Sequence, residues 1–334
     1  MQVEDGRGET RGRESVPAGE PDSKRVREVA GLLVCVLDVV GSHVDKDVAY
    51  DDPDPDFLNN GNHDKQDDGN SSDEYEPPDL EARFPTEPVY GTRSGEVLDA
   101  DGVRAGRQKE LDSIARHHVI EVVPNGREGK HIRGGWVEDY KGYPTVRSRF
   151  VAKEVAYDTR DDVTQSTPAL LIFRLLLALV CSGFVGPPSV ACFAVFDISV
   201  AFFHARLPKG TTIFVHPPKD LVERGFCWRL RRSMYGTRSA SRAWGDRVRE
   251  VLRKAGCVVL RTMSMMFHHP TDGYVVAVWG DDFGCIGSHT GIDRLRKVLE
   301  DNFESNVVGI IGPGQGDMVR LLYREISWDV HGFY

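Results

Sequence analysis

Paired cysteines and metal-binding cysteine–histidine patterns are missing from this sequence. No two of its cysteines form a Cys-x-x-Cys pair, and none has a histidine at zinc-finger spacing. The sequence therefore gives no sign of a zinc finger or a disulfide framework, and we expect reduced, mostly buried thiols. The cysteines are Cys35, Cys181, Cys192, Cys227, Cys257 and Cys285.

A secretory signal and a membrane-spanning run are also missing. The first 28 residues are polar and charged, and the apolar runs Val29–Leu37 and Leu170–Val180 are short. A membrane helix takes roughly 20 apolar residues. We therefore expect a soluble intracellular protein with no membrane partner, in a cytoplasmic or nuclear compartment that the sequence leaves open.

Charge of both signs is present, but it is unevenly distributed along the chain. Residues 1–100 carry 25 acidic and 10 basic side chains, whereas residues 101–334 carry 26 acidic and 32 basic ones. Residues 45–82 alone hold 14 acidic side chains against two lysines. Such a stretch buries too little apolar surface to offset the entropy of ordering. We therefore expect residues 1–100 to be a mostly disordered acidic region or linker, with ordered structure beginning near Arg104.

Beyond that point the sequence predicts a mixture of helices and strands. Hydrophobic periodicity, β-branched and aromatic runs, and turn residues give the boundaries. Pro168 follows Thr167, an N-cap hydroxyl, at the start of one helix, and Ser241 is the expected N-cap of another. The expected helices are 110–117, 169–181, one starting at 241, and 292–303; the expected strands are 131–137, 145–153, 191–200, 274–278 and 283–286.

The most informative pattern is a pair of aspartates between two apolar segments. Asp281 and Asp282 lie at the tip of an expected β-hairpin, where aspartate is also favoured simply as a turn residue. Asp197 interrupts the apolar strand 191–200, and a carboxylate there is costly unless it is hydrogen-bonded, paired or bound to a metal. If the two strands are neighbours, the three carboxylates meet at one end of a sheet.

Three clustered carboxylates form the oxygen environment that Mg²⁺ prefers, because this ion keeps waters and shares ligands with substrate phosphates. Two such ions stabilise the attacking and the leaving oxygen in an in-line phosphoryl transfer. The pattern therefore favours two Mg²⁺ ions, with Mn²⁺ as a possible substitute, and nucleotidyl-transfer chemistry.

Six segments, in order along the chain, resemble the motifs of copia-type retrotransposon reverse transcriptases. Asp197-Ile198-Ser199-Val200-Ala201-Phe202-Phe203 is similar to the family's Asp-Val-x-x-Ala-Phe-Leu. Trp279-Gly280-Asp281-Asp282 stands where the family has Tyr-Val-Asp-Asp. The resemblance covers residues 108–330. The other segments are Arg147–Lys153, Arg174–Leu179, Ile213–Pro218, and Leu230–Gly236 followed by Arg242–Trp244.

The resemblance implies an α+β fold of the right-hand polymerase type. An antiparallel palm sheet backed by helices would be joined to fingers, with fingers at about 101–165 and part of 205–240 and palm in the remainder of 101–334. Thumb, ribonuclease H and integrase segments are not evident, which leaves open any part in DNA integration. The implied function is RNA-directed DNA polymerase, a nucleotidyltransferase that acts on deoxynucleotides with an RNA or DNA template and a primer.

The resemblance also implies residue roles. Asp197, Asp281 and Asp282 would be catalytic metal ligands, with the backbone carbonyl of Ile198 as a further ligand. Phe202 would be the steric gate against ribonucleotides; without the resemblance it is equally an ordinary core phenylalanine. The remaining deoxynucleotide-binding residues would be Arg149, Lys153 and Tyr235, and the nucleic-acid-binding residues Arg231, Arg232, Arg238 and Arg242.

Two features leave the interpretation open. Residues 224–261 hold 11 basic side chains against two acidic ones, which fits either a track for phosphates or a solvated helix face. The chain also departs from the family pattern at Glu154, Ser241 and Trp279-Gly280. The alternative function is therefore a catalytically inactive, truncated retroelement remnant that at most binds nucleic acid.

Overall fold

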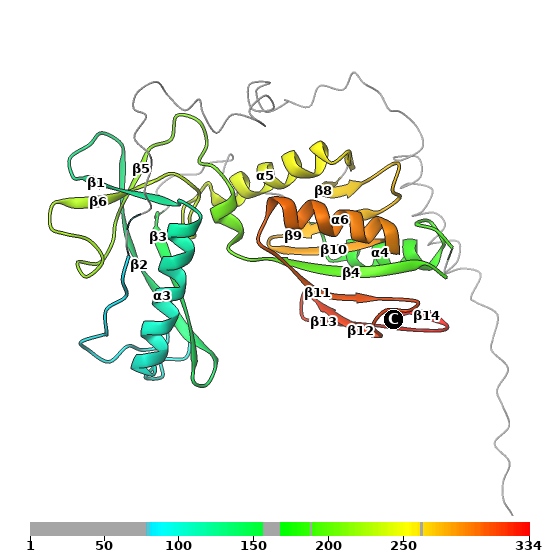
Figure 1. The fold of residues 1–334 in the computed structure, drawn as a ribbon, viewed down its shortest axis with the longest axis horizontal. Helices are drawn as coiled ribbons and strands as arrows, with labels where there is room; N and C mark the ends of the chain where they lie inside the picture. The colour runs from blue at the N-terminus through cyan, green and yellow to red at the C-terminus, as the bar shows by residue number, and fades with distance from the viewer. Residues whose placement is uncertain (1–77, 79, 156–167, 188, 261–262) are drawn as a thin grey trace, which may run out of the picture. The chain divides into compact units, whose positions relative to one another are not determined.

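The computed structural model describes residues 78, 80–155, 168–187, 189–260 and 263–334. Within them the chain folds as a mixed α+β structure with a five-stranded sheet, a six-stranded sheet and a small three-stranded sheet (Figure 1). The expected α+β class is therefore confirmed. Residues 1–77, which make up most of the expected acidic linker, lie outside the described residues.

The five-stranded sheet has the strand order β1-β6-β5-β2-β3. Its strands are antiparallel except for β2 and β5, which run parallel. Helix α3 lies along β3 (Figure 1). Leu111 and Ile114 of α3 share an apolar cluster with Phe150 and Trp228 of the sheet. The elements are α3 (Ala100–Arg116), β1 (Ile120–Pro124), β2 (Lys130–Gly142), β3 (Thr145–Lys153), β5 (Ile213–His216) and β6 (Phe226–Leu230).

Helix α3 begins ten residues before the expected helix 110–117. The Asp99 side chain caps it by accepting a hydrogen bond from the Gly102 amide. Gly102 and Gly106 lie one turn apart and face β3. A Cβ added at Gly102 would lie 2.8 Å from the Pro144 oxygen, and one added at Gly106 would lie 2.7 Å from the Val146 oxygen. Glycine usually weakens a helix, but here it allows the helix to approach the strand. Packed structure also begins before Arg104, because Leu80 and Ala82 are buried.

The six-stranded sheet has the order β11-β4-β10-β9-β8-β7, and its neighbouring strands are antiparallel. Strand β4 is apolar along nearly its whole length because both of its faces are covered. A short 3-10 helix, η2 (Ala201–His204), follows it. The strands are β4 (Ala191–Ile198), β7 (Val258–Leu260), β8 (Met263–His268), β9 (Val275–Trp279), β10 (Asp282–Ser288) and β11 (Ser305–Ile311).

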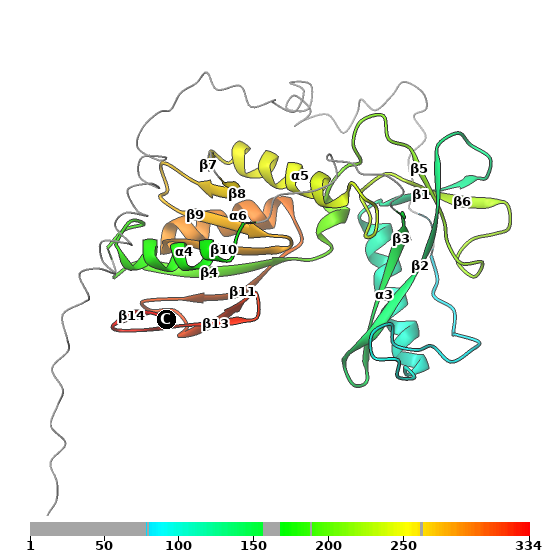
Figure 2. The same ribbon diagram turned by 180° about the vertical axis from the view of Figure 1, so that it is seen from behind.

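Helices cover the two faces of this sheet. Trp244 and Val248 of α5 (Ala240–Lys254) and Leu295 of α6 (His289–Asn302) share one apolar cluster with Phe196 and Phe283. On the other face α4 (Leu171–Cys181) contacts the sheet, with its Phe173 ring 6.2 Å from that of Phe193. Figure 2 shows α4 and β4 from behind. The sheet is therefore the buried centre of this part of the chain.

The small sheet, β12-β13-β14, packs on the same face as α4. Leu321 of β12 and Leu176 of α4 both approach Gly284 of β10, where an added Cβ would lie 2.7 and 3.7 Å from their side chains. The sequence pattern predicts none of these strands, which are β12 (Met318–Leu321), β13 (Arg324–Asp329) and β14 (Gly332–Phe333).

Most other expected elements are present with shifted ends. The strand 145–153 has the expected bounds, whereas the strand expected at 131–137 extends over 130–142. The expected N-cap Ser241 is wrong: Ser239 precedes α5, and Ser241 lies in its first turn. Thr167, the other expected N-cap, lies outside the described residues. None of the helices in the described residues is long and apolar enough to cross a membrane.

Candidate active site

The three aspartates lie together at one end of the six-stranded sheet. Asp197 of β4 is paired directly with Asp282 of β10, and Asp282 is also paired with Trp279 of β9. Residues opposite each other on antiparallel strands share a face of the sheet. Gly280 and Asp281 form the two-residue link between β9 and β10, and the Ile198 amide donates to the Asp281 carbonyl over 3.0 Å. The structure therefore places the three carboxylate-bearing residues side by side.

Crowding of like charge affects the protonation of these carboxylates. Burial, followed by the charges of Asp281 and Asp197, raises the pKa of Asp282 to about 6. Burial and Asp281 also raise the pKa of Asp197, while Arg147, Lys141 and Arg149 act in the opposite direction. The cluster is thus an anionic site that a bound cation would stabilise.

The carboxylates do not form a closed cage. Among the described residues, no three His, Cys, Asp or Glu side chains converge closely enough to hold a metal ion by themselves. An open set of carboxylates fits Mg²⁺ in its chemistry, because this ion keeps several waters and takes substrate phosphate oxygens as ligands.

The Gly280–Asp281 turn is held from outside the sheet. The Trp244 indole Nε1 donates to the Gly280 carbonyl over 2.6 Å, and the Trp279 indole Nε1 donates to the Pro168 carbonyl over 2.9 Å. Gly280 has a φ of +71°, a conformation that glycine adopts without strain. At Trp279-Gly280, where the chain departs from the family's Tyr-Val, the Trp279 side chain anchors the end of β9 and Gly280 allows the tight turn.

A basic and aromatic group accompanies the carboxylates. The Arg149 guanidinium lies 4.9 Å from the centre of the Tyr235 ring, and the Phe202 ring lies edge-on to Tyr235 at 5.1 Å. Burial raises the pKa of Tyr235 to about 12, against the lowering effect of Arg149. Phe202 is half-buried whereas Phe203 is fully buried, so Phe202 is the one with an accessible ring.

Backbone contacts explain why Tyr235 is followed by glycine. The Ala152 amide of β3 donates to the Tyr235 carbonyl over 2.7 Å. Gly236 has a φ of +83°, and an added Cβ would lie 2.0 Å from the Ala152 oxygen. Glu154, which departs from the family pattern, strengthens the contact between β3 and the segment after Tyr235. Its carboxylate accepts hydrogen bonds from the Arg238 amide and from the Lys130 ammonium. The Tyr-Gly segment is therefore fixed against the edge of β3.

The expected dNTP-binding pair on β3 is only partly brought together. Arg149 and Lys153 share the exposed face of the strand, as alternation requires. The Lys153 ammonium, however, lies beside Gly135 of β2, where an added Cβ would be 2.8 Å away. Arg149 contacts Tyr235, and its charge acts on Asp197.

The four arginines expected to bind nucleic acid lie near β6 and α5. Arg231 pairs with Glu121 at 3.7 Å and Arg242 with Asp246 at 4.0 Å. Arg232 bridges to Arg206 through the backbone, and the Arg238 amide donates to Glu154. On α5, ion pairs join basic side chains to Asp246 and Glu250, which favours a solvated helix face for much of that charge.

Sequence reasoning did not assign two residues near the aspartates. Arg147 is exposed on the same face of β3 as Arg149 and acts on Asp197, and strand alternation could have identified it. Asn306 of β11 is paired with Asp197 and donates through Nδ2 to the Ser199 hydroxyl over 2.9 Å. No pattern around Asn306 signals this position.

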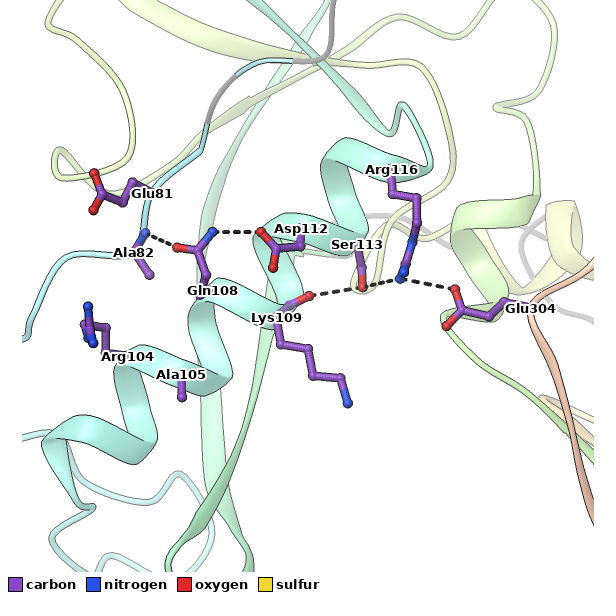
Figure 3. A pocket seen from close by; sticks show the side chains of 10 residues that line it. All are labelled: Glu81, Ala82, Arg104, Ala105, Gln108, Lys109, Asp112, Ser113, Arg116 and Glu304. Atoms are coloured by element: carbon purple, nitrogen blue, oxygen red, sulfur yellow. Dashed lines mark hydrogen bonds and ion pairs between the residues drawn. The ribbon is translucent and has the colours of Figure 1, made fainter.

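A groove of about 500 Å³ lies elsewhere, along the outer face of α3 (Figure 3). Gln108 holds one wall by accepting from the Ala82 amide and donating to the Leu80 carbonyl. At the other end Arg116 pairs with Glu304 at 3.2 Å. None of the expected site residues lines this groove.

The mixed α+β fold and the three neighbouring aspartates fit a nucleotidyltransferase domain of the polymerase type, and a family match supports that class. Residues 117–313 match the family model described as "Reverse transcriptase (RNA-dependent DNA polymerase)". This match spans more than half of the sequence, and the chain belongs to this reverse transcriptase family. A comparison with curated protein sequences found no match.

Solved structures of low similarity include a viral reverse transcriptase and a telomerase. One is a foamy viral protease–reverse transcriptase in complex with double-stranded DNA, with 12% identity and a TM-score of 0.37, covering 75% of this chain and 38% of that one. Another is apo telomerase from Candida tropicalis truncated from its C-terminal domain, with 8% identity and a TM-score of 0.42, covering 72% and 61%. This chain spans less than two thirds of either, and the family assignment stands on the family model.

Proposed function

We propose that this chain is the RNA-directed DNA polymerase core of a copia-type retrotransposon polyprotein. It adds deoxynucleotides to a primer 3′-hydroxyl on an RNA or DNA template. The observation that carries the proposal is the pairing of Asp197 with Asp282, with Asp281 in the adjoining turn. Arg149, Tyr235 and Phe202, which contact one another in turn, supply the nucleotide-binding side.

Asp197, Asp281 and Asp282, together with the Ile198 carbonyl, would hold two Mg²⁺ ions, or Mn²⁺ in their place. When bound, such ions stabilise the attacking and leaving oxygens of in-line phosphoryl transfer. The protein's own contribution is to keep the carboxylates at one strand end through the β4–β10 register and the Trp244 contact to the turn.

The remaining residues bind and select the substrate. The Arg149 guanidinium suits phosphate oxygens, because it offers a planar fork of donors. Lys153 on the same face of β3 adds a second cation for the triphosphate. Phe202 excludes a ribose 2′-hydroxyl because its half-buried ring is backed by Tyr235. Arg231, Arg232, Arg238 and Arg242 contact template–primer phosphates by charge, in a sequence-independent way.

The two large sheets correspond to the parts of a polymerase hand in this proposal. Residues 101–165 and part of 205–240, which include the five-stranded sheet, would be fingers. The remainder, with the six-stranded sheet, would be palm. This division is supported by the strand orders, since Asp197 and Asp282 belong to the six-stranded sheet and Arg149 to the other.

Primer extension on an RNA template with deoxynucleotides and Mg²⁺ or Mn²⁺ tests the proposal. Asp281→Asn removes one carboxylate charge, and Asp301→Asn is the matched control at an exposed position of α6. We expect extension by the parent and by Asp301→Asn, and a loss of about 10³-fold or more in Asp281→Asn. A folded parent that binds primer–template without extending it would support the inactive-remnant alternative.

A further inference from the structure

Helix α3 buries a carboxylate that the proposed mechanism does not use. Glu110 is 7% exposed, and it is one of the few buried charged residues among the described ones. A buried carboxylate is costly unless hydrogen bonds compensate for its lost hydration. Its Oε1 accepts a hydrogen bond from the Phe150 amide of β3 over 3.2 Å.

The bond belongs to a row of contacts along the free edge of β3. Strand β3 is the last strand of its sheet, so alternate amides along it point away from the neighbouring strand β2. The Phe150 amide donates to Glu110, the Ala152 amide to the Tyr235 carbonyl and the Glu154 amide to the Gly236 carbonyl. Glu110 therefore extends, with a side chain, the pairing that the Tyr235–Gly236 segment begins.

Arg149 lies directly before the amide that Glu110 holds. Its guanidinium stacks on Tyr235, whose carbonyl holds the next outward amide of the same edge. The side-chain charges of Arg149 and Arg147 act on Glu110, and that of Glu110 acts on Tyr235. A single carboxylate is thus coupled to the backbone and to both partners of the Arg149–Tyr235 stack.

We propose that Glu110 is a positioning residue for nucleotide binding: its carboxylate fixes the outer edge of β3 so that Arg149 stays stacked on Tyr235, facing the aspartates. This inference rests on the proposed polymerase function and assigns the control of dNTP affinity to a residue of α3. Glu110 itself touches neither metal nor substrate. Its effect reaches the nucleotide through Arg149.

Two variants of equal bulk separate the hydrogen bond from the volume. Glu110→Gln keeps an oxygen that accepts from the Phe150 amide, whereas Glu110→Met fills the space without an acceptor. In primer extension we expect Glu110→Met to raise the KM for dNTP by about 5–10-fold, the value of one hydrogen bond. We expect kcat to stay within about twofold and Glu110→Gln to restore the parent KM.

The same substitution in an Arg149→Ala background tests the route of the effect. If Glu110 acts through Arg149, Glu110→Met adds less than about twofold to the KM of Arg149→Ala. Full additivity, or a fall in kcat at unchanged KM, would overturn the inference and leave Glu110 as a purely structural residue. Should Glu110→Met fail to fold, Glu110→Asp replaces it, because its shorter side chain draws the acceptor away from Phe150.

A binding measurement keeps this inference separate from the polymerase proposal. The full chain is mixed with a dideoxy-terminated primer–template, and the next complementary dNTP is titrated. The fraction of primer–template that stays bound to the protein is measured at each dNTP concentration. Weaker dNTP binding in Glu110→Met but not in Glu110→Gln supports the inference even without turnover. Parent extension with equal KM in both variants overturns the inference alone, and a parent that binds no dNTP overturns both proposals.

Discussion

The indole Nε1 of Trp244 donates a 2.6 Å hydrogen bond to the carbonyl oxygen of Gly280. Trp244 is fully buried in α5, whereas Gly280 is exposed in the turn that carries Asp281. A helix on one face of the sheet thereby fixes the position of the turn at its end. The Arg-Ala-Trp segment of the chain has a structural reason for its tryptophan.

Replacing Trp244 by phenylalanine removes this bond and part of the buried ring. We expect a loss of about 1–3 kcal/mol in the free energy of unfolding. We also expect about tenfold slower primer extension, since a displaced turn misplaces Asp281. Urea denaturation and extension rates check the two effects. Trp328→Phe, at a half-buried position of β13, is the control and should change neither. Equal extension rates in both variants would contradict a role for the bond.

Gly236→Ala should destabilise the protein by about 3–5 kcal/mol, because it adds a steric clash to a left-handed backbone. Its Cβ would lie 2.0 Å from the Ala152 oxygen, and φ is +83°. Gly210→Ala is the matched control, since its φ is +73° but no atom lies within 4 Å of the added Cβ. That variant should cost about 1 kcal/mol. Thermal and urea denaturation of both proteins give the comparison, and equal costs would mean that β3 shifts freely.

Phe202→Ala should relax sugar selection. Removing the ring opens the space where a 2′-hydroxyl would lie, and steric selection of this kind is worth about 10–200-fold. We therefore expect the ratio of kcat/KM for dNTP to that for rNTP to fall by at least about tenfold. Phe184→Ala removes another half-buried ring, one that packs near His268, and should leave the ratio unchanged. An unchanged ratio in Phe202→Ala would identify Phe202 as a packing residue.

Glu110 should make stability depend on pH. Burial raises its pKa to about 7, against the opposing Phe150 amide and the charges of Arg149 and Arg147 on β3; Tyr235 also faces it. The folded state therefore holds the proton more tightly than the unfolded state, whose pKa is near 4.5. The associated stability is complete below pH 4.5 and is lost as pH rises through about 7.

Glu110→Gln removes this titration. The free energy of unfolding of the parent, relative to Glu110→Gln, should fall by about 2–3 kcal/mol between pH 4.5 and 8. Urea denaturation of the two proteins at several pH values measures the difference. Parallel pH profiles would show that Glu110 has the same pKa in the folded and unfolded states, and would contradict the shift caused by burial.

Much of the aspartate-bearing end of the sheet could be predicted from the sequence. Asp197 and Asp281-Asp282 are marked by their apolar surroundings, and the hairpin pattern predicts that β9 and β10 are neighbours. The sequence leaves open whether β4 lies beside β10, and the structure shows that it does. The length of α3 was not foreseen, because Gly102 and Gly106 weaken a helix locally but permit close packing on β3. The partner of Glu110 was also hidden, since the Phe150 amide is 40 residues away and only tertiary packing brings them together.

The pairing of Asp197 with Asp282 joins positions some 85 residues apart, and no local segment contains both. During synthesis, therefore, an emerging chain has no anionic centre until β10 has left the ribosome and paired with β4. A slip of one residue in that pairing would turn Asp282 to the opposite face of the sheet. The three aspartates therefore come together only late in folding, when the long-range pairing of β4 with β10 forms.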